Sequence, residues 1–255
     1  MTDPRLTLNS IQMPHARSIT TPVVDLRTVD GKRTRQLQLG AAVTAYDTGE
    51  MTLIQAADNY VGWVATDTLG PPIKPTHSVG TFATHAYATD DMKSPDLMRL
   101  GFGARVIVID ERRKFYETNV GYIPKAHLRA LDRPFEDPAT IAQLHFGVPY
   151  LWGGNSTSGI DCSGLIAASL LACGIPCPAD SDMQCDQLGH DFTGDPQRGD
   201  IIFWKGHVGM MVDAETMIHA NAHHMATRYE PLANAMIRIE AQGDGKIIAR
   251  KRLGD

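Results

Sequence analysis

A cysteine and two histidines in the C-terminal half of the chain have the residue types needed for nucleophilic catalysis. Cys162 lies where a glycine-rich stretch, residues 150–161, gives way to an apolar helix pattern that ends at Gly174. At the start of a helix, backbone N–H groups and the helix dipole favour a thiolate over a thiol. His207 and His219 follow, each within a predicted strand. The pattern therefore indicates a cysteine nucleophile with a histidine base.

Within such a set, His207 would accept the proton of Cys162, and His219 would hold the imidazole of His207 in the required tautomer. Each residue also has a purely structural interpretation. Free cysteines are commonly small buried residues, and a single histidine on an apolar strand is more often part of a core. A tight turn at residues 213–216 would offset the two histidines, so the strand pair must be staggered or twisted for the rings to meet.

The elements around these residues predict an α+β domain over residues 132–255. Helices are expected at residues 138–146 and from Cys162 onward, before a series of strands. Helices followed by strands indicate a helix packed on an antiparallel sheet. The predicted strands are residues 200–204, 207–212, 217–220, 236–239 and 246–250.

The N-terminal part of the chain predicts two small all-β barrels. Short β-type runs punctuated by glycines fill residues 21–69, and a related pattern follows. Val61-Gly-Trp-Val64 is echoed by Val120-Gly-Tyr-Ile123 at an offset of 59 residues, which indicates two divergent copies of one unit. We assign residues 1–72 to the first barrel with an N-terminal extension and residues 73–131 to the second. Prolines at 71, 72 and 75 form a stiff linker between them.

Composition narrows the classes of function. The 255 residues are 43% hydrophobic and 21% charged, which is typical of a soluble globular protein. A net charge of −5 without a Lys/Arg cluster argues against nucleic-acid binding. No apolar run is long enough to span a membrane. The first residues lack a basic leader followed by an apolar core, so we expect a cytoplasmic location.

The cysteines favour free thiols over disulfides or a metal site. All four cysteines follow residue 160, in a long chain without a visible export signal. Cys173 and Cys177 have a spacing that metal ligands can have, but no second Cys or His pair completes a zinc site. We therefore expect no metal and no cofactor.

Three motifs in order resemble a known family. Gly159-Ile-Asp-Cys-Ser-Gly-Leu165, His207-Val-Gly-Met210 and Ile218-His-Ala220 resemble the NlpC-type papain-like cysteine peptidases of bacterial cell-wall metabolism. The similarity spans about residues 138–252. The two predicted barrels close on a glycine-aromatic-aliphatic pattern that resembles bacterial SH3-like domains. The resemblance implies a papain-like catalytic domain that follows two SH3-like barrels.

Two SH3-like domains before such a domain resemble the γ-D-glutamyl-L-diamino-acid endopeptidases, a subgroup similar to dipeptidyl-peptidase VI. This implies hydrolysis of the γ-D-glutamyl–diamino acid bond in murein peptides with a free N-terminal L-alanine, during recycling of cell-wall peptides. The expected partner is that small peptide, bound by a monomer.

The resemblance also implies site residues. Tyr150 matches the tyrosine that supports the oxyanion together with the backbone N–H of Cys162, which is a sound arrangement of donors. Its structural alternative is an ordinary buried aromatic residue beside Trp152. Asp161 and Ser163 flank the nucleophile and match residues that receive the α-ammonium group of alanine, a cation that needs several acceptors. Asp161 is also a candidate N-cap.

Further implied residues lie in a second loop and in the first barrel. Asp180 and Ser181 resemble the start of the family's next substrate-binding loop, and Tyr60 matches a tyrosine that the first barrel lends to the pocket. The family's acidic partner in that barrel is a glutamate, and none stands at the matching turn, so Asp30 or Asp25 is the candidate.

Other functions fit parts of the same pattern. The chain could be a non-catalytic cell-wall-binding protein whose peptidase domain is vestigial, although the intact Cys-His-His set argues against this. The same catalytic domain could act as a D,L-endopeptidase on intact peptidoglycan, or in acyl transfer. The second barrel could be a spacer or bind a wall polymer without taking part in chemistry.

Overall fold

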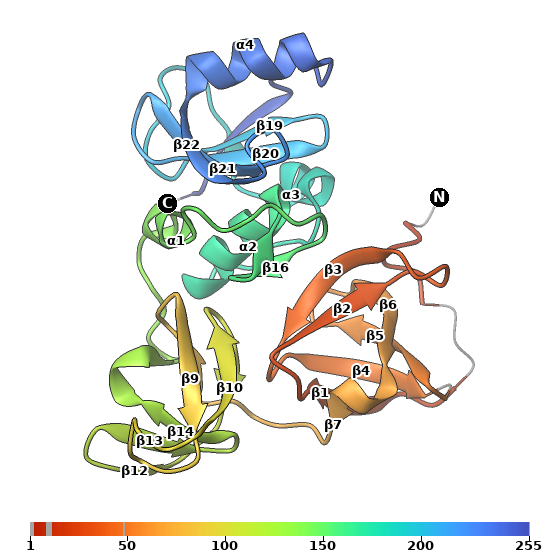
Figure 1. Ribbon diagram of the computed structural model, residues 1–255. Coiled ribbons are helices and arrows are strands. Elements are labelled where there is room, and N and C mark those ends of the chain that lie inside the picture. Colours follow the sequence, from red (N-terminus) through yellow and green to blue (C-terminus); the bar gives the residue numbers. More distant parts are fainter. Residues whose placement is uncertain (1–2, 9–11, 48, 255) are drawn as a thin grey trace. The chain divides into compact units, whose positions relative to one another are not determined.

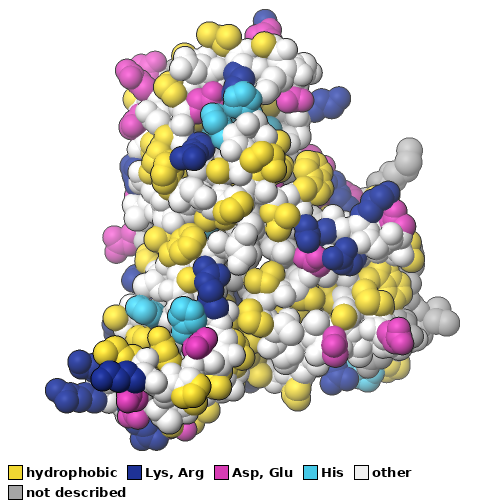
Figure 2. Space-filling view, viewed as in Figure 1, with side chains coloured by type: hydrophobic (Ala, Val, Ile, Leu, Met, Phe, Trp, Pro, Cys, Tyr) yellow, Lys and Arg dark blue, Asp and Glu magenta, His cyan; other side chains and the backbone are white. Residues whose placement is uncertain are grey.

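The computed structural model describes residues 3–8, 12–47 and 49–254 of a mixed α/β protein. It divides into two compact units, Met1–Pro134 and Phe135–Asp255 (Figure 1). Within the described residues, no helix is long and apolar enough to cross a membrane. On the face shown in Figure 2, basic and acidic side chains are interspersed, and the basic ones do not gather into one surface.

The first half of the N-terminal unit is a seven-stranded antiparallel sheet with the order β3-β2-β6-β5-β4-β1-β7. Alternating residues along β2 and β6 point inward, so Leu26 and Val64 are fully buried with Ile54. The strands are β1 His15–Ile19, β2 Val23–Arg27, β3 Arg33–Gln38, β4 Ala42–Asp47, β5 Met51–Ala56, β6 Val61–Ala65 and β7 Leu69–Gly70.

The second half contains a five-stranded sheet with the order β10-β9-β14-β13-β12 and a three-stranded sheet with the order β11-β8-β15. Leu100, Val106 and Ile123 form its fully buried centre. The strands are β8 His77–Val79, β9 Ala83–Tyr87, β10 Asp96–Gly101, β11 Arg105–Val106, β12 Val108–Glu111, β13 Phe115–Thr118, β14 Gly121–Pro124 and β15 Leu128–Ala130.

The two halves share a structural repeat. In the first, β6 runs into a short 3₁₀ helix, Thr66–Thr68, and then into β7; in the second, β14 runs into the 3₁₀ helix Lys125–His127 and then into β15. The two 3₁₀ helices are offset by 59 residues, the same offset as that between the two related sequence patterns. The halves also pack directly on each other, because Leu39 joins the core of the second half and its carbonyl accepts a hydrogen bond from the Arg105 N–H at 2.9 Å.

The C-terminal unit is built on a six-stranded antiparallel sheet with the order β18-β23-β19-β20-β21-β22. Figure 1 shows α2 and α4 on opposite faces of this sheet. Its helices are α1 Pro138–Leu144, α2 Cys162–Ala172, α3 Ser181–Gln187 and α4 Leu232–Gln242. Its strands are β16 Asn155–Ser156, β17 Gly159–Ile160, β18 His190–Asp191, β19 Ile201–Trp204, β20 His207–Met211, β21 Thr216–Asn221, β22 Ala226–Pro231 and β23 Ala249–Arg252.

The end of the chain differs from its sequence-based prediction. Residues 236–239 lie within helix α4 and not in a strand, because Leu232, Ala235 and Ile239 recur at helical spacing and bury one face against the sheet. The strand predicted at residues 246–250 begins only at Ala249. Strand β22 was not predicted, because its sequence, Ala-Thr-Arg-Tyr-Glu-Pro, carries no clear apolar alternation.

Candidate active site

Cys162 is the first residue of helix α2 and is held there by its neighbours. The backbone of Asp161 is extended, and its carboxylate accepts a hydrogen bond from the Gly164 N–H at 2.7 Å, which makes it the N-cap. Gly164 allows the preceding loop to approach the first turn, since a Cβ there would lie 2.3 Å from the carbonyl oxygen of Gly154. The thiol is buried in the core between α2 and the sheet.

The sulfur of Cys162 meets strand β20 at Val208, beside His207. Ladder pairs between β20 and β21 are formed at Met210 and Met211, and the two strands separate before Val208 is reached. The Val208 N–H therefore has no ladder partner on β21 and interacts with the sulfur of Cys162. The opening of this ladder gives the nucleophile a fixed contact one residue away from the candidate base.

His207 and His219 are brought together as a hydrogen-bonded pair. Nε2 of His207 lies 2.9 Å from Nδ1 of His219. The pairing of Met210 with Ile218, continued along the strands, places His219 opposite Gly209 and diagonal to His207. Gly209 leaves the space that the rings need, because a Cβ there would lie 3.2 Å from the Cβ of His219 and 2.2 Å from Cε of Met217.

His219 is thus offset from His207 by two residues along the strand pair, as the sequence required. The twist of the two strands brings the two rings together across this offset. Side chains alternate along β20, so Val208 faces α2, whereas Met211 faces α4. By this alternation His207 and His219 are on the α4 side. The thiol and the imidazole therefore reach the open end of β20 at adjacent residues, from the two sides of the sheet.

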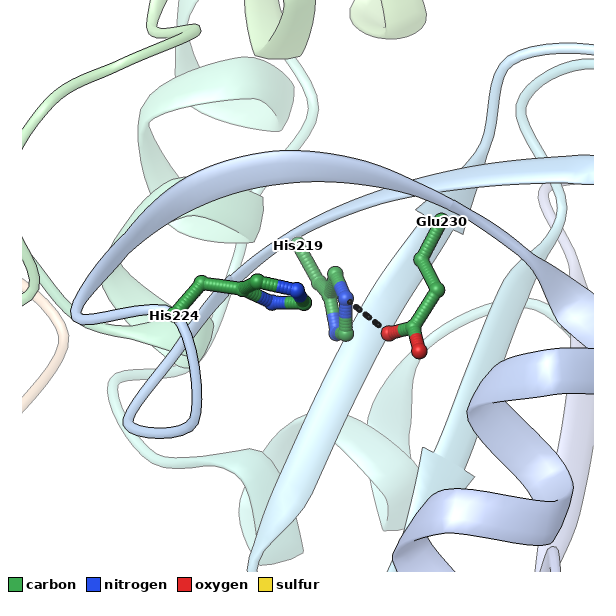
Figure 3. Close-up of side chains that lie close together, drawn as sticks. All are labelled: His219, His224 and Glu230. Carbon is green, nitrogen blue, oxygen red and sulfur yellow. Dashed lines mark ion pairs between the residues drawn. The ribbon is translucent and has the colours of Figure 1, made fainter.

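Two charged residues missed by the sequence analysis continue the histidine pair. Nε2 of His219 lies 3.0 Å from Oε2 of Glu230, and Figure 3 shows the His219 ring between Glu230 and His224. Arg238 of helix α4 donates two hydrogen bonds to the carboxylate of Glu230, at 2.9 and 2.7 Å. Glu230 was missed because strand β22, which positions it next to His219, was not predicted from the sequence.

Tyr150 lies close enough to the nucleophile to respond to its charge. Burial raises the pKa of the Tyr150 phenol, and the negative charges of Cys162 and Asp161 raise it further. The phenol therefore stays protonated and is a hydrogen-bond donor. Its backbone is fixed by a hydrogen bond from its N–H to the Met225 carbonyl at 2.9 Å.

Asp161, Ser163 and Asp180, which the sequence predicts to bind substrate, form one polar cluster. The Asp161 carboxylate accepts hydrogen bonds from the Ser163 hydroxyl at 3.1 Å and from the Gly153 N–H at 2.8 Å. Burial raises the pKa of Asp161, the hydrogen bonds oppose the rise, and the charge of Asp180 adds to it. Asp180 is the N-cap residue of helix α3, whose first residue is Ser181.

Gln184 links the two parts of this cluster. Its amide group is fully buried and donates hydrogen bonds at 3.0 Å to the carbonyls of Ser163 and Pro178. The start of helix α3 is thereby tied to the first turn of helix α2. This link between the two helices is visible only in three dimensions.

The three candidates from the first predicted barrel lie in the N-terminal unit. Tyr60 is buried there, with the guanidinium carbon of Arg35 5.4 Å from its ring centroid. Asp30 is exposed at the β2–β3 turn, and hydrogen bonds from Lys32 and Thr28 lower its pKa to about 2. Asp25 pairs with Arg33 at 2.7 Å.

His219 also belongs to a group of three potential metal ligands, but this group does not suit a metal ion. Ligand atoms of His219, His224 and Glu230 lie within 4.8 Å of one another. The Glu230 carboxylate is already neutralised by the two hydrogen bonds from Arg238, so a dication would meet a fixed guanidinium. No disulfide joins any of the four cysteines, all of which lie within the described residues.

Burial favours the neutral form of both the thiol and the candidate base, in opposition to the thiolate expected from the helix start. Burial raises the pKa of Cys162 to about 12, and the charge of Asp161 adds to the rise, although backbone N–H groups at Val208 and Ser163 oppose it. Burial also lowers the pKa of His207 to about 3, and the charges of His219 and Arg238 lower it further. Desolvation outweighs the helix terminus for both groups.

These two shifts predict the protonation of the free protein. A thiol with a raised pKa keeps its proton as the pH rises, and an imidazole with a lowered pKa stays neutral as the pH falls, so the pair is uncharged between about pH 5 and pH 9. We expect the thiolate absorbance of the wild type minus that of Cys162→Ser to show no step in this range. A step with its midpoint in the acid half of the range would mean a preformed ion pair and would contradict this assignment.

Comparisons with known proteins agree with this geometry. Residues 147–241 match the sequence profile of the NlpC/P60 family. A dipeptidyl-peptidase 6 of Lysinibacillus sphaericus is 31% identical over 40% of this chain and 41% of its own length. A gamma-D-glutamyl-L-lysine dipeptidyl-peptidase of Bacillus subtilis is 34% identical over 33% of this chain and 31% of its own length. The chain thus matches less than half of these relatives.

A solved structure resembles nearly the whole chain. The crystal structure of an NlpC/P60 family protein from Bacillus cereus superposes with a TM-score of 0.79, covering 93% of this chain and 99% of that one. At 19% identity this likeness concerns the fold alone. The profile match covers the helix that begins at Cys162 and both histidine strands, and residues 147–241 are accordingly an NlpC/P60 family domain.

Proposed function

We propose that this protein is a cysteine endopeptidase that hydrolyses the γ-D-glutamyl–diamino acid bond of murein peptides with a free N-terminal L-alanine. The observation that carries the proposal is the buried thiol of Cys162 held at the backbone N–H of Val208, next in sequence to His207, which forms a hydrogen-bonded pair with His219. The NlpC/P60 profile and the relatives named as dipeptidyl-peptidases support the same reaction class.

In the proposed reaction the proton of the Cys162 thiol passes to Nδ1 of His207 as the sulfur attacks the γ-carbonyl carbon. Negative charge develops on the carbonyl oxygen, which the Tyr150 phenol and the Cys162 N–H stabilise. The C–N bond then breaks, and His207 returns the proton to the departing amine. Water, deprotonated by His207, hydrolyses the resulting thioester and restores the thiol.

The polar cluster next to the nucleophile supports recognition of an ammonium group. Asp161, Ser163, Asp180 and Ser181 offer carboxylate and hydroxyl acceptors beside the first turn of α2. A bound cation would compensate the buried carboxylate of Asp161, whose charge otherwise opposes ionisation of Cys162. Binding of the substrate amine would in this way lower the pKa of the nucleophile.

We further propose that residues 1–72 and 73–131 are SH3-like barrels. The repeated strand–3₁₀ helix–strand order supports two related barrels. The lack of a disulfide among the described cysteines suits a role in the cytoplasm, in recycling of murein peptides.

The first prediction concerns the nucleophile. Cys162→Ala should fold normally and lose about 10⁴-fold or more of its activity on the tripeptide L-Ala-γ-D-Glu-diaminopimelate, because no thioester can form. Cys173→Ala, at the other end of the same helix, is the matched control and should keep wild-type activity. Release of the free diamino acid measures both. Undiminished hydrolysis by Cys162→Ala would refute the mechanism.

The second prediction concerns the ammonium pocket. N-acetylation of the alanine removes the cation, so kcat/KM should fall by about 10²-fold or more, since buried acceptors are left without their charged partner. Equal cleavage of the two peptides would show that the proposed pocket is wrong. Efficient digestion of isolated peptidoglycan in the same assay would favour the alternative of a wall-acting endopeptidase.

A further inference from the structure

We infer that Glu230 is a positioning residue, which fixes the protons of both histidines so that His207 presents an unprotonated Nδ1. This inference rests on the proposed function, because it concerns the same candidate base. It is carried by an unbroken line of polar contacts from Arg238 through Glu230 and His219 to His207.

The proton order follows from the chemistry of each contact. Glu230 carries a carboxylate, because burial alone would raise its pKa but hydrogen bonds from His219 and Arg238 hold it well below its usual range. A carboxylate can only accept, so we assign the proton of His219 to Nε2, the nitrogen 3.0 Å from Oε2 of Glu230, although the ring N–H is not aligned with that oxygen. A neutral His219 then has a lone pair on Nδ1.

The position of the proton on His219 determines the position of the proton on His207. Nδ1 of His219 lies 2.9 Å from Nε2 of His207, and an acceptor on one side of this contact requires a donor on the other. The proton of neutral His207 is therefore on Nε2, and its Nδ1 is the nitrogen left to accept a proton. A single carboxylate, two rings away, thus determines which nitrogen of the base is available.

The surrounding charges allow this order. His219 is fully buried, and burial lowers its pKa while Glu230 opposes that change. The other charged or titratable groups that act on His219 are Arg238 of α4 and His224 of the loop before β22. Nδ1 of His224 is 3.0 Å from Oδ1 of Asn221, so this nitrogen of His224 is engaged by Asn221.

A glutamine at position 230 would reverse the order. Its amide oxygen would be drawn to the Arg238 guanidinium, and its NH₂ group would then face His219 as a donor. Nε2 of His219 would become the acceptor, its proton would move to Nδ1, and the proton of His207 would move to Nδ1 as well. The nitrogen that should accept the proton of Cys162 would then already be protonated.

The test compares two variants that break the same ion pair. In Glu230→Gln the acceptor for His219 is lost, whereas in Arg238→Met the carboxylate remains. We expect Glu230→Gln to lower kcat by about 10- to 100-fold with KM little changed, Arg238→Met to stay within about threefold, and Glu230→Asp to recover part of the loss. Thermal unfolding of each variant shows whether the fold is kept.

A second readout requires no substrate. Long-range proton–nitrogen correlation spectra of the full-length protein, with His207→Asn used for assignment, should show His207 protonated on Nε2 in the wild type and in Arg238→Met. In Glu230→Gln they should show it protonated on Nδ1. If the wild type cleaves no murein peptide but the tautomers change as stated, the proposed function fails while the inference about Glu230 holds.

Two outcomes would overturn the inference. One is an unchanged His207 tautomer and unchanged kcat in Glu230→Gln. The other is an equal fall in kcat and in thermal stability for Glu230→Gln and Arg238→Met, because Glu230 would then serve only to fasten α4 to β22.

Discussion

The hydrogen bond between the two imidazoles is the constraint on which the rest of the site depends. It requires a defined register between β20 and β21 and a residue without a side chain at position 209. It also requires that the pairing of the two strands ends before Val208. The same opening exposes a backbone N–H to the sulfur of Cys162. One local departure from regular strand pairing therefore positions both the base and the nucleophile.

Burial, and not the helix start, dominates the charge state of the resting site. A helix terminus stabilises a nearby charge by about 0.3–1 kcal/mol, and by up to about 2 kcal/mol in favourable geometry. Full burial can shift a pKa by about 3–5 units, which corresponds to about 4–7 kcal/mol and is several times larger than the helix effect. Asp161 strengthens this effect because it places a buried carboxylate next to the thiol. These surroundings favour a neutral thiol and a neutral imidazole, and a cationic substrate group is the partner that we propose for Asp161.

The parts of the fold set by local patterns could be predicted from the sequence. Helix α2 begins at Cys162 because Asp161 is a strong N-cap, and the histidine strands follow from short apolar runs. Helix α4 was missed because Met236 to Ile239 is apolar enough to be taken for a strand, while the helical spacing of Leu232, Ala235 and Ile239 becomes decisive only against a sheet.

Within the candidate site, the sequence singled out Cys162, His207 and His219, but it did not indicate the partners that the structure gives to His219. Glu230 and Arg238 belong to elements that were unrecognised or wrongly assigned, and their pairing with His219 depends on the packing of α4 against β22. The effect of burial on the pKa of Cys162 could not be predicted from the sequence either, because the burial of this residue depends on residues far apart in the chain.

The most direct test of the histidine pair is scalar coupling through the hydrogen bond between the two rings. In full-length protein with nitrogen-labelled histidines, we expect a coupling between Nε2 of His207, which carries the proton, and Nδ1 of His219, which does not. The absence of this coupling in a folded sample, or a His207 ring protonated on Nδ1, would rule out this arrangement of the two histidines.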